Sequence, residues 1–480
     1  MNRKDTEFVK KTVARIGEET IRVSDSICRY AELSYEEFRS MEELCGFLSK
    51  EEFAVEQNIA GMPTCFRAVY GEGKPVIGLL GEFDALDGLS QEPGIPEHKP
   101  IKENAPGHGC GHCCLGAASA AAAVAVKEYL KENSLQGTVI YFGCPAEEGA
   151  GSKQFMARAG VFDGVDFAVT WHPSTLNEIS ADESTAIMGA NFSFKGIAAH
   201  AGGSPWFGRS ALDAAELMNV GCNYLREHIP DGQRIHYAYA NAGGSAPNVV
   251  PAFAKIKYEV RARKVSEVKE LFRRVVKCAE GAATMTETEM QYEITMAFSD
   301  FSQNSVLAET ASECLMELGA PEWGEEDYAL AKQFLNSYDD LSLENIRREI
   351  RNTFGRGRYE EILEKPLHSE VFPYDPRNGK PKGGSTDVGD VSYAVPVTEI
   401  RVACACVGNI GHTWQMAGQA GSSIGHKGLL RAAEVMALTC IRVMNDPERI
   451  EKAKVETLLK NGGKYECPLP DSVLPPIGRY

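Results

Sequence analysis

The segment GAASAAAAVAVKEYLKENSLQGTVIYFGCPAEEG, residues 116–149, decides the fold class. Its first half predicts a helix over 116–132, whose small residues allow close packing on a sheet, and its second half predicts a buried strand that ends at an acidic loop. Similar apolar runs at 75–86 and 165–173 indicate further strands of the same kind. Because these strands alternate with helices, we predict an α/β domain with a mostly parallel sheet.

The pattern changes near residue 188, where strands of alternating polar and apolar residues replace the buried runs. About four strands and two helices in roughly 110 residues predict an inserted α+β sandwich. The chain then becomes helical, passes a polar and charge-rich stretch at 321–384, and returns to a strand in TEIRVACACVG. We therefore predict a main domain formed by residues 1–187 and 301–480, with residues 188–300 as the insertion.

Composition and charge exclude several classes of protein. A net charge of −17 over 480 residues argues against partners such as nucleic acids and anionic membranes, because both need basic surfaces. No apolar run is expected to reach the roughly 20 residues that cross a bilayer. Most of the 14 cysteines lie in apolar surroundings, which is typical of buried free thiols in a reducing compartment. We expect a cytoplasmic protein.

Candidate metal ligands follow the ends of four predicted strands. They are Cys110 and His112, then Glu147 and Glu148, then His172, and finally His412. Because ligands of open α/β sheets bind at the carboxyl ends of the strands, we expect these side chains to converge at one edge. A thiolate, imidazoles and a carboxylate suit zinc or a similar divalent ion. A second, free carboxylate beside a metal-activated water is what amide hydrolysis requires.

Other interpretations of these residues stay open at this point. The spacing from Cys110 to Cys113 also fits a thioredoxin-like redox centre or a structural zinc site. Against the redox centre, Gly109 precedes the pair, and about a hundred residues of unrelated α/β pattern come first. Against structural zinc, no second pair of ligands follows close by. His426 is a rival to His412 as the last ligand, but it stands just ahead of a helix.

Several motifs together carry a resemblance to a known family. They are GEFDAL, GHGCGH, GCPAEEG, TWHP, KGIAAHAGGSPWFGRSALDA, GGSAPNVVP, GSTDVGDVS and GHTWQ…GSSIGHKG. In this order they resemble the metal-dependent aminoacylase/carboxypeptidase family of amidohydrolases, and within it the p-aminobenzoyl-glutamate hydrolase group and its dipeptidase relatives. The resemblance spans nearly the whole chain. It implies an α/β dinuclear-metallopeptidase catalytic domain with an inserted, ferredoxin-like lid and dimerisation domain.

The resemblance implies a site with two divalent ions, zinc or manganese. Cys110 would bridge the ions, with His112 and His172 on one of them and Glu148 and His412 on the other.

The remaining roles concern catalysis and substrate binding. Glu147 would be the general base and acid, and His200 of the lid would polarise the substrate carbonyl, in relatives often across the dimer interface. Asn248 and Arg261 match positions that hold the substrate carboxylate, for which a guanidinium is chemically suited. Relatives commonly carry Asp or Asn directly after the Gly-His of this motif, where this chain has Cys113 and Cys114, so a side chain that orients the metal ligands is expected to be missing or replaced.

The implied activity is hydrolysis of the amide bond in small N-acyl-amino acids such as p-aminobenzoyl-glutamate, by a homodimer or together with a related second subunit. One alternative is a dipeptidase for β-alanyl or basic dipeptides. Another is a catalytically inactive protein that binds an amino-acid conjugate or serves only as a partner subunit. The complete ligand set and the Glu147–Glu148 pair argue against an inactive protein.

Overall fold

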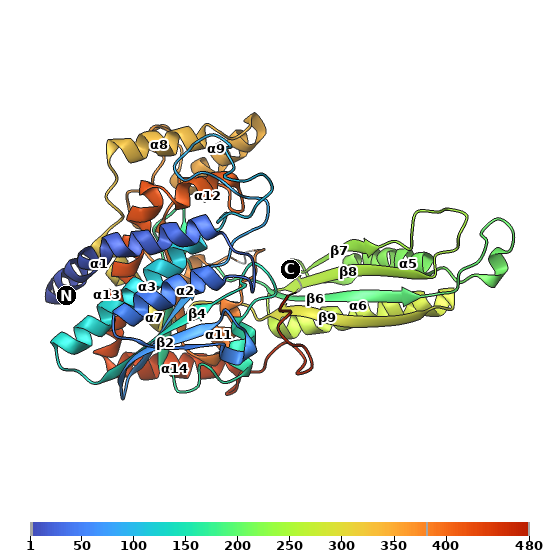
Figure 1. Ribbon diagram of the computed structural model, residues 1–480, viewed down its shortest axis with the longest axis horizontal. Helices are drawn as coiled ribbons and strands as arrows, with labels where there is room; N and C mark the ends of the chain where they lie inside the picture. The colour runs from blue at the N-terminus through green and yellow to red at the C-terminus, as the bar shows by residue number, and fades with distance from the viewer. Residues whose placement is uncertain (1–2, 381–382, 479–480) are drawn as a thin grey trace.

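The computed structural model describes residues 3–380 and 383–478, which form a broad catalytic domain and a long, narrow lid (Figure 1). The catalytic domain contains a six-stranded sheet in the order β1 (Ala54–Gln57), β2 (Phe66–Glu72), β4 (Gly137–Cys144), β3 (Val76–Glu82), β5 (Phe167–Ser174) and β10 (Val397–Ala403). Strands β4, β3, β5 and β10 are parallel, whereas β1 and β2 pair antiparallel at one edge. The parallel pairing brings the carboxyl ends of four strands to one edge of the sheet.

Helices cover both faces of this sheet. One face packs against α1 (Arg3–Tyr30), α2 (Phe38–Lys50), α3 (His112–Glu132), α7 (Ser305–Leu318) and α13 (Ser423–Met444). The other face packs against α4 (Lys153–Arg158) and α11 (Val388–Ala394), and α14 (Pro447–Asn461) packs against α7 and α11. The predicted α/β architecture with a mostly parallel sheet is confirmed.

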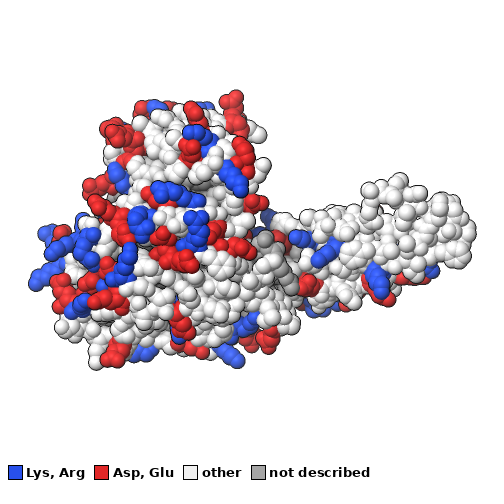
Figure 2. Space-filling model, viewed as in Figure 1, with Lys and Arg blue, Asp and Glu red and all other residues white. Residues whose placement is uncertain are grey.

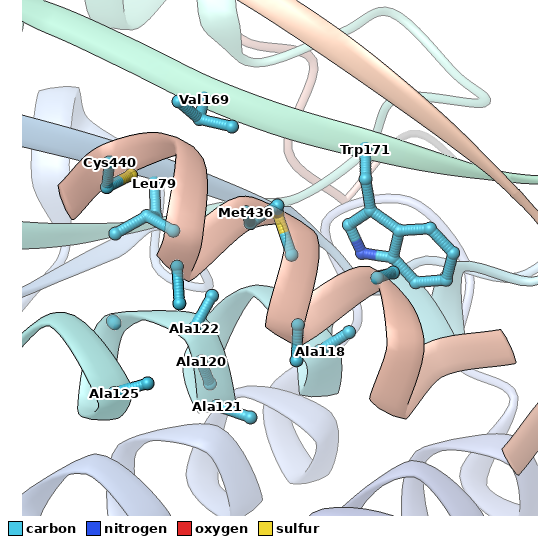
Figure 3. Close-up of a cluster of buried hydrophobic side chains, with 14 of the residues drawn as sticks. Leu79, Ala118, Ala120, Ala121, Ala122, Ala125, Val169, Trp171, Met436 and Cys440 are labelled. Atoms are coloured by element: carbon cyan, nitrogen blue, oxygen red, sulfur yellow. The ribbon is translucent and has the colours of Figure 1, made fainter. Parts of the chain in front are cut away.

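Helix α3 lies at the centre of the larger core. Its alanines share one hydrophobic cluster with Met436 and Cys440 of α13 and with Leu79, Val169 and Trp171 of the strands (Figure 3). Because an alanine adds so little bulk, α3 can approach both the sheet and α13 closely. This close approach also holds the first residue of the helix, His112, at the edge of the sheet.

By length and composition α3 could cross a membrane, so the prediction that no run is apolar enough is wrong by this measure. In the structure, 94% of its most apolar window is buried inside the protein. Its hydrophobicity therefore serves packing within the catalytic domain.

The lid is a four-stranded antiparallel sheet with two helices on one face. Its strands lie in the order β7 (Arg234–Asn241), β8 (Phe253–Ala262), β6 (Ala186–Lys195) and β9 (Glu289–Phe298), and its helices are α5 (Ala211–Leu225) and α6 (Val265–Thr286). The register pairs Ile187 with Arg261 next to the catalytic domain and Lys195 with Phe253 at the outer end. The long axis of the lid thus follows its strands away from the catalytic domain (Figure 1).

Within the polar stretch, residues 325–364 form a helical insert. It contains α8 (Glu325–Leu335), α9 (Asp340–Phe354) and α10 (Tyr359–Glu364), and α8 lies close to α12 (Trp414–Ala420) (Figure 1). A small hydrophobic core holds these helices together and joins them to the segment that follows β10.

Candidate metal centre

Cys110 occupies the middle of a cluster at the carboxyl edge of the sheet. Its Sγ lies 3.4 Å from His172 Nε2. The possible ligand atoms of Cys110, His112 and His172 lie within 4.8 Å of one another, and so do those of Cys110, Glu148 and His412. Cys110 is common to both groups, so two adjacent cation positions would share its sulfur. Burial raises the pKa of this thiol, so a bound cation is needed to favour its thiolate.

His112 is oriented by a carboxylate that the sequence analysis did not single out. Its Nδ1 lies 3.0 Å from Asp84 Oδ1, which directs Nε2 into the cluster. The other oxygen of Asp84 accepts a hydrogen bond of 2.9 Å from the backbone nitrogen of Glu148. Burial alone would raise the pKa of Asp84, but the hydrogen bond and charge of His112 hold it below its usual value. One ionised carboxylate therefore aligns two candidate ligands.

His172 stands near the end of β5, where its backbone belongs to the sheet. Its Nδ1 lies 2.8 Å from the carbonyl oxygen of Pro173, and its Nε2 faces Cys110. Burial lowers the pKa of His172. The ring is therefore held as a neutral imidazole, the form that binds metals.

His412 and Glu148 close the cluster on its solvent side. His412 Nε2 lies 3.5 Å from Glu148 Oε2, and the His412 side chain is 57% exposed. The backbone nitrogen of His412 donates a 2.8 Å hydrogen bond to the carbonyl of Gly109, which joins the His412 loop to the Cys110 loop. A methyl group at Gly109 would lie 3.3 Å from the Cα of His412, so the two loops approach each other closely at this glycine.

Two buried polar atoms indicate that the cluster is built for cations. Among the described residues, His112 Nε2 and Glu148 Oε1 have no hydrogen-bond partner. They lie 4.0 Å apart, and His112 Nε2 also lies 3.4 Å from Glu82 Oε2. Unpartnered buried groups are costly and call for a ligand. A thiol, three imidazoles and a carboxylate match the ligand preferences of zinc and related divalent ions. The residues present therefore fit a pair of divalent ions.

Glu147 lies on a different side of the cluster from Glu148. It forms a third acidic group with Glu82 and His112, whose possible ligand atoms also lie within 4.8 Å. The ammonium group of Lys153 already forms ion pairs beside this third group. Its Nζ lies 2.7 Å from Glu82 Oε1 and 2.6 Å from Asp387 Oδ1. We therefore do not count the third group as a metal site.

The surroundings of Glu147 favour its protonated form. Burial and the charges of Glu82 and Glu148 raise the pKa of Glu147 well above its usual range. A carboxyl group with a raised pKa can both take up and release a proton near neutral pH.

The three candidate site residues of the lid lie at its two opposite ends. His200 is exposed beyond the outer end of β6, and the backbone carbonyl of Asn248 accepts a 2.9 Å hydrogen bond from the nitrogen of Ala201 beside it. Arg261 lies near the catalytic domain and donates to Ser385 Oγ at 3.0 Å. Along β6 the two ends, Ile187 and Lys195, are eight residue steps apart, a span of about 27 Å at roughly 3.4 Å per step. Within one chain, His200 and Asn248 do not reach the cluster.

The tautomer of His200 follows from its loop. Its Nδ1 accepts hydrogen bonds from the backbone nitrogens of Gly202 at 3.2 Å and Gly203 at 3.0 Å. In the neutral ring, Nε2 therefore carries the proton and is available as a donor.

The alternatives raised by the sequence receive no support from the geometry. His426 Nε2 lies 2.8 Å from Asp25 Oδ1 of α1 and forms no part of the described cluster. Cys113 is fully buried, and the thiols that affect its pKa are those of Cys28 and Cys114. Cys110 and Cys113 are both free thiols. No disulfide therefore joins Cys110 to Cys113 in the structure.

Four residues around the cluster were missed as individual candidates, namely Glu82, Asp84, Lys153 and Asp387. Three of them stand in the motifs GEFDAL and GSTDVGDVS, which was the available signal. An orienting carboxylate is nevertheless present, because Asp84, in the segment that follows β3, contacts His112.

Comparison with known proteins gives consistent results. The model of peptidase family M20/M25/M40 matches residues 78–344. The chain is 42% identical over 460 residues to the B subunit of p-aminobenzoyl-glutamate hydrolase from Escherichia coli strain K12, covering 94% of this chain and 95% of that protein. It is 27% identical to the Xaa-Arg dipeptidase of Mus musculus, covering 95% of this chain and 92% of that protein.

Solved structures share the fold. A putative aminohydrolase from methicillin-resistant Staphylococcus aureus has a TM-score of 0.65 and 17% identity, covering 92% of this chain and all (100%) of that one. The YXEP protein of Bacillus subtilis, described as a dinuclear metal-binding peptidase of family M20, has a TM-score of 0.57 and 15% identity, covering 90% of this chain and 99% of that one. The family resemblance predicted from the motifs is confirmed: the chain belongs to peptidase family M20/M25/M40 and is an enzyme of the metal-dependent amidohydrolase and peptidase type.

Proposed function

We propose that the protein hydrolyses the amide bond of small N-acyl-amino acids such as p-aminobenzoyl-glutamate. The observation that carries this proposal is the cluster in which Cys110 stands between two ligand groups, with unpartnered atoms of His112 and Glu148 facing each other. The substrate class is supported by the 42% identity, along nearly the whole chain, to the B subunit of p-aminobenzoyl-glutamate hydrolase.

The proposed cofactor is a pair of divalent ions, zinc or manganese. Cys110 would contact both ions, His112 and His172 would hold one, and Glu148 and His412 would hold the other. When bound, such ions supply Lewis acidity that polarises the scissile carbonyl and lowers the pKa of the attacking water.

The chain's own residues would move the proton and hold the substrate. Glu147 would take a proton from the attacking water and deliver it to the nitrogen of the leaving amino acid. Its raised pKa, caused by burial and neighbouring acids, suits the second of these steps. Arg261 would hold the carboxylate of the substrate, because its guanidinium lies where the lid meets the catalytic domain.

The lid tip would act on a second copy of the chain. His200 and Asn248 lie too far from their own cluster, whereas the Nε2–H of His200 is a donor suited to a developing oxyanion. Near them, Trp206 and Phe207 are each 67% exposed, and the visible outer part of the lid carries few charged side chains (Figure 2). Exposed aromatic residues in weakly charged surroundings favour contact with another protein.

A different but related polypeptide is the other possible partner. The chain is also 30% identical to the A subunit of p-aminobenzoyl-glutamate hydrolase from Escherichia coli strain K12, covering 49% of this chain and 57% of that protein. The same lid tip would serve such a partner.

A dipeptidase is the second candidate function, because of the 27% identity to Xaa-Arg dipeptidase over 95% of the chain. The experiment compares both substrate classes after loading with zinc or manganese. We expect p-aminobenzoate to be released from p-aminobenzoyl-glutamate faster than amino acids are released from dipeptides ending in arginine. The reverse order would favour the dipeptidase.

Inactive variants identify the site that is responsible. His172→Ala should lose both metal and activity, whereas Glu147→Gln should lose activity alone. The inactive, conjugate-binding alternative would be favoured if the wild-type protein binds two ions but hydrolyses neither p-aminobenzoyl-glutamate nor the dipeptides. The assay is repeated with the related partner added.

A further inference from the structure

The helical insert packs directly against the loop that carries His412. The insert's small core includes Phe334 and Tyr338, and it also includes Cys406 and Val407, which follow β10. At Gly408 the backbone has φ +84, and an added methyl group would lie 2.4 Å from Ile346 of α9. Helix α9 therefore rests on the backbone of this loop, at a place where only glycine fits.

The hydroxyl group of Tyr338 connects the insert to the next two residues of the loop. It donates a hydrogen bond of 2.9 Å to Asn409 Oδ1 and accepts one of 3.0 Å from the backbone nitrogen of Ile410. Gln419 of α12 donates to the same Asn409 oxygen at 2.9 Å. The loop is thus held from both sides two residues before His412.

His412 depends on this support more than the other imidazoles do. His112 and His172 each have an acceptor at Nδ1, which fixes the ring from within the catalytic core. For His412 the described residues provide no such acceptor, and its side chain is more than half exposed. Its backbone has φ 57, which is an uncommon conformation for a residue other than glycine. Such a conformation persists only when the surrounding structure imposes it.

We propose that Tyr338 is a positioning residue for His412, and that the insert thereby sets the affinity of one of the two metal positions. The inference rests on the two-ion site of the proposed function. Tyr338 acts through Asn409 and Ile410, and it touches neither the ions nor the substrate. Loss of its hydroxyl frees the loop, so His412 and Glu148 no longer present their ligand atoms together.

The test is Tyr338→Phe, which keeps the ring in the insert's core and removes only the hydroxyl. The matched control is Tyr328→Phe, because Tyr328 is a partly buried tyrosine of the same insert whose ring lies under Lys365. Metal-free proteins are titrated with Zn²⁺ in competition with a chromogenic chelator, and bound zinc is counted by elemental analysis. Melting temperatures establish that each variant is folded.

We expect Tyr338→Phe to bind one ion as the wild type does and the other at least about 10-fold more weakly. At limiting metal it should contain close to one ion per chain, and saturating zinc should restore kcat. His412→Ala should weaken the same ion, and Asn409→Ala should cause the same loss as Tyr338→Phe with little added effect in the double variant. Tyr328→Phe should match the wild type.

Several results overturn the inference. These are wild-type affinity for both ions in Tyr338→Phe, equal weakening of both ions, or the same weakening in Tyr328→Phe. A wild-type protein that binds fewer than two ions overturns the two-ion site together with this inference. A wild-type protein that binds two ions but hydrolyses no amide overturns the proposed function only, because the metal titration still reports on Tyr338.

Discussion

Asp84→Asn tests the central geometrical claim about the metal centre. The carboxylate of Asp84 accepts from His112 Nδ1 with one oxygen and from the Glu148 backbone nitrogen with the other, at 3.0 and 2.9 Å. Asparagine has the same shape but only one acceptor oxygen. Whichever way the amide is turned, its NH₂ group faces a donor, so either His112 or Glu148 loses its alignment.

The size of the effect follows from this loss. A hydrogen bond to a charged group is worth about 2 kcal/mol, which corresponds to roughly 30-fold in metal affinity. This lies within the range of about 10- to 100-fold that is typical when a partner of a metal ligand is removed. The residue is fully buried, so solvent cannot replace the missing acceptor.

The assay is a competition titration with zinc, with a melting curve to show that the variant is folded. Asp87→Asn is the matched control, because it makes the same chemical change at an exposed position three residues away. Zinc affinity within about threefold of the wild type in folded Asp84→Asn would refute the argument that this carboxylate aligns the ligands.

Further predictions concern the roles of single residues. Glu147→Gln should keep its metals and lose at least about 100-fold in kcat, whereas Glu148→Gln should lose metal. If the two variants exchange these properties, the roles of Glu147 and Glu148 are reversed. Cys110→Ser should impair metal binding, but Cys113→Ser should not; equal, redox-dependent losses would instead point to a dithiol centre. Mixing inactive His200→Ala with inactive Glu147→Gln should restore up to about a quarter to a half of the activity if His200 acts across a dimer. If the two variants are shown to exchange chains but no activity is recovered, His200 acts in the site of its own chain or has no role in catalysis.

The sequence alone determined the fold class and the candidate ligands. Hydrophobic periodicity reports on local structure, so the helix at 116–132 and the strand after it could be predicted from their residues. Chemically distinctive residues at the ends of parallel strands must meet at one edge of the sheet. For that reason Cys110, His172 and Glu148 could be placed together from the sequence, although the roles assigned to them stay predictions.

Only the tertiary structure decided which residues support these ligands and how far the lid reaches. The partners of Asp84, Lys153 and Tyr338 lie 28 to 234 positions away in the chain, and no local pattern encodes such pairings. The separation of His200 from Arg261 likewise follows from strand register and the direction of the lid, because both are set by packing. Local residue patterns specify helices, strands and the chemistry that they carry, whereas the position of one element against another follows from burial across the whole chain.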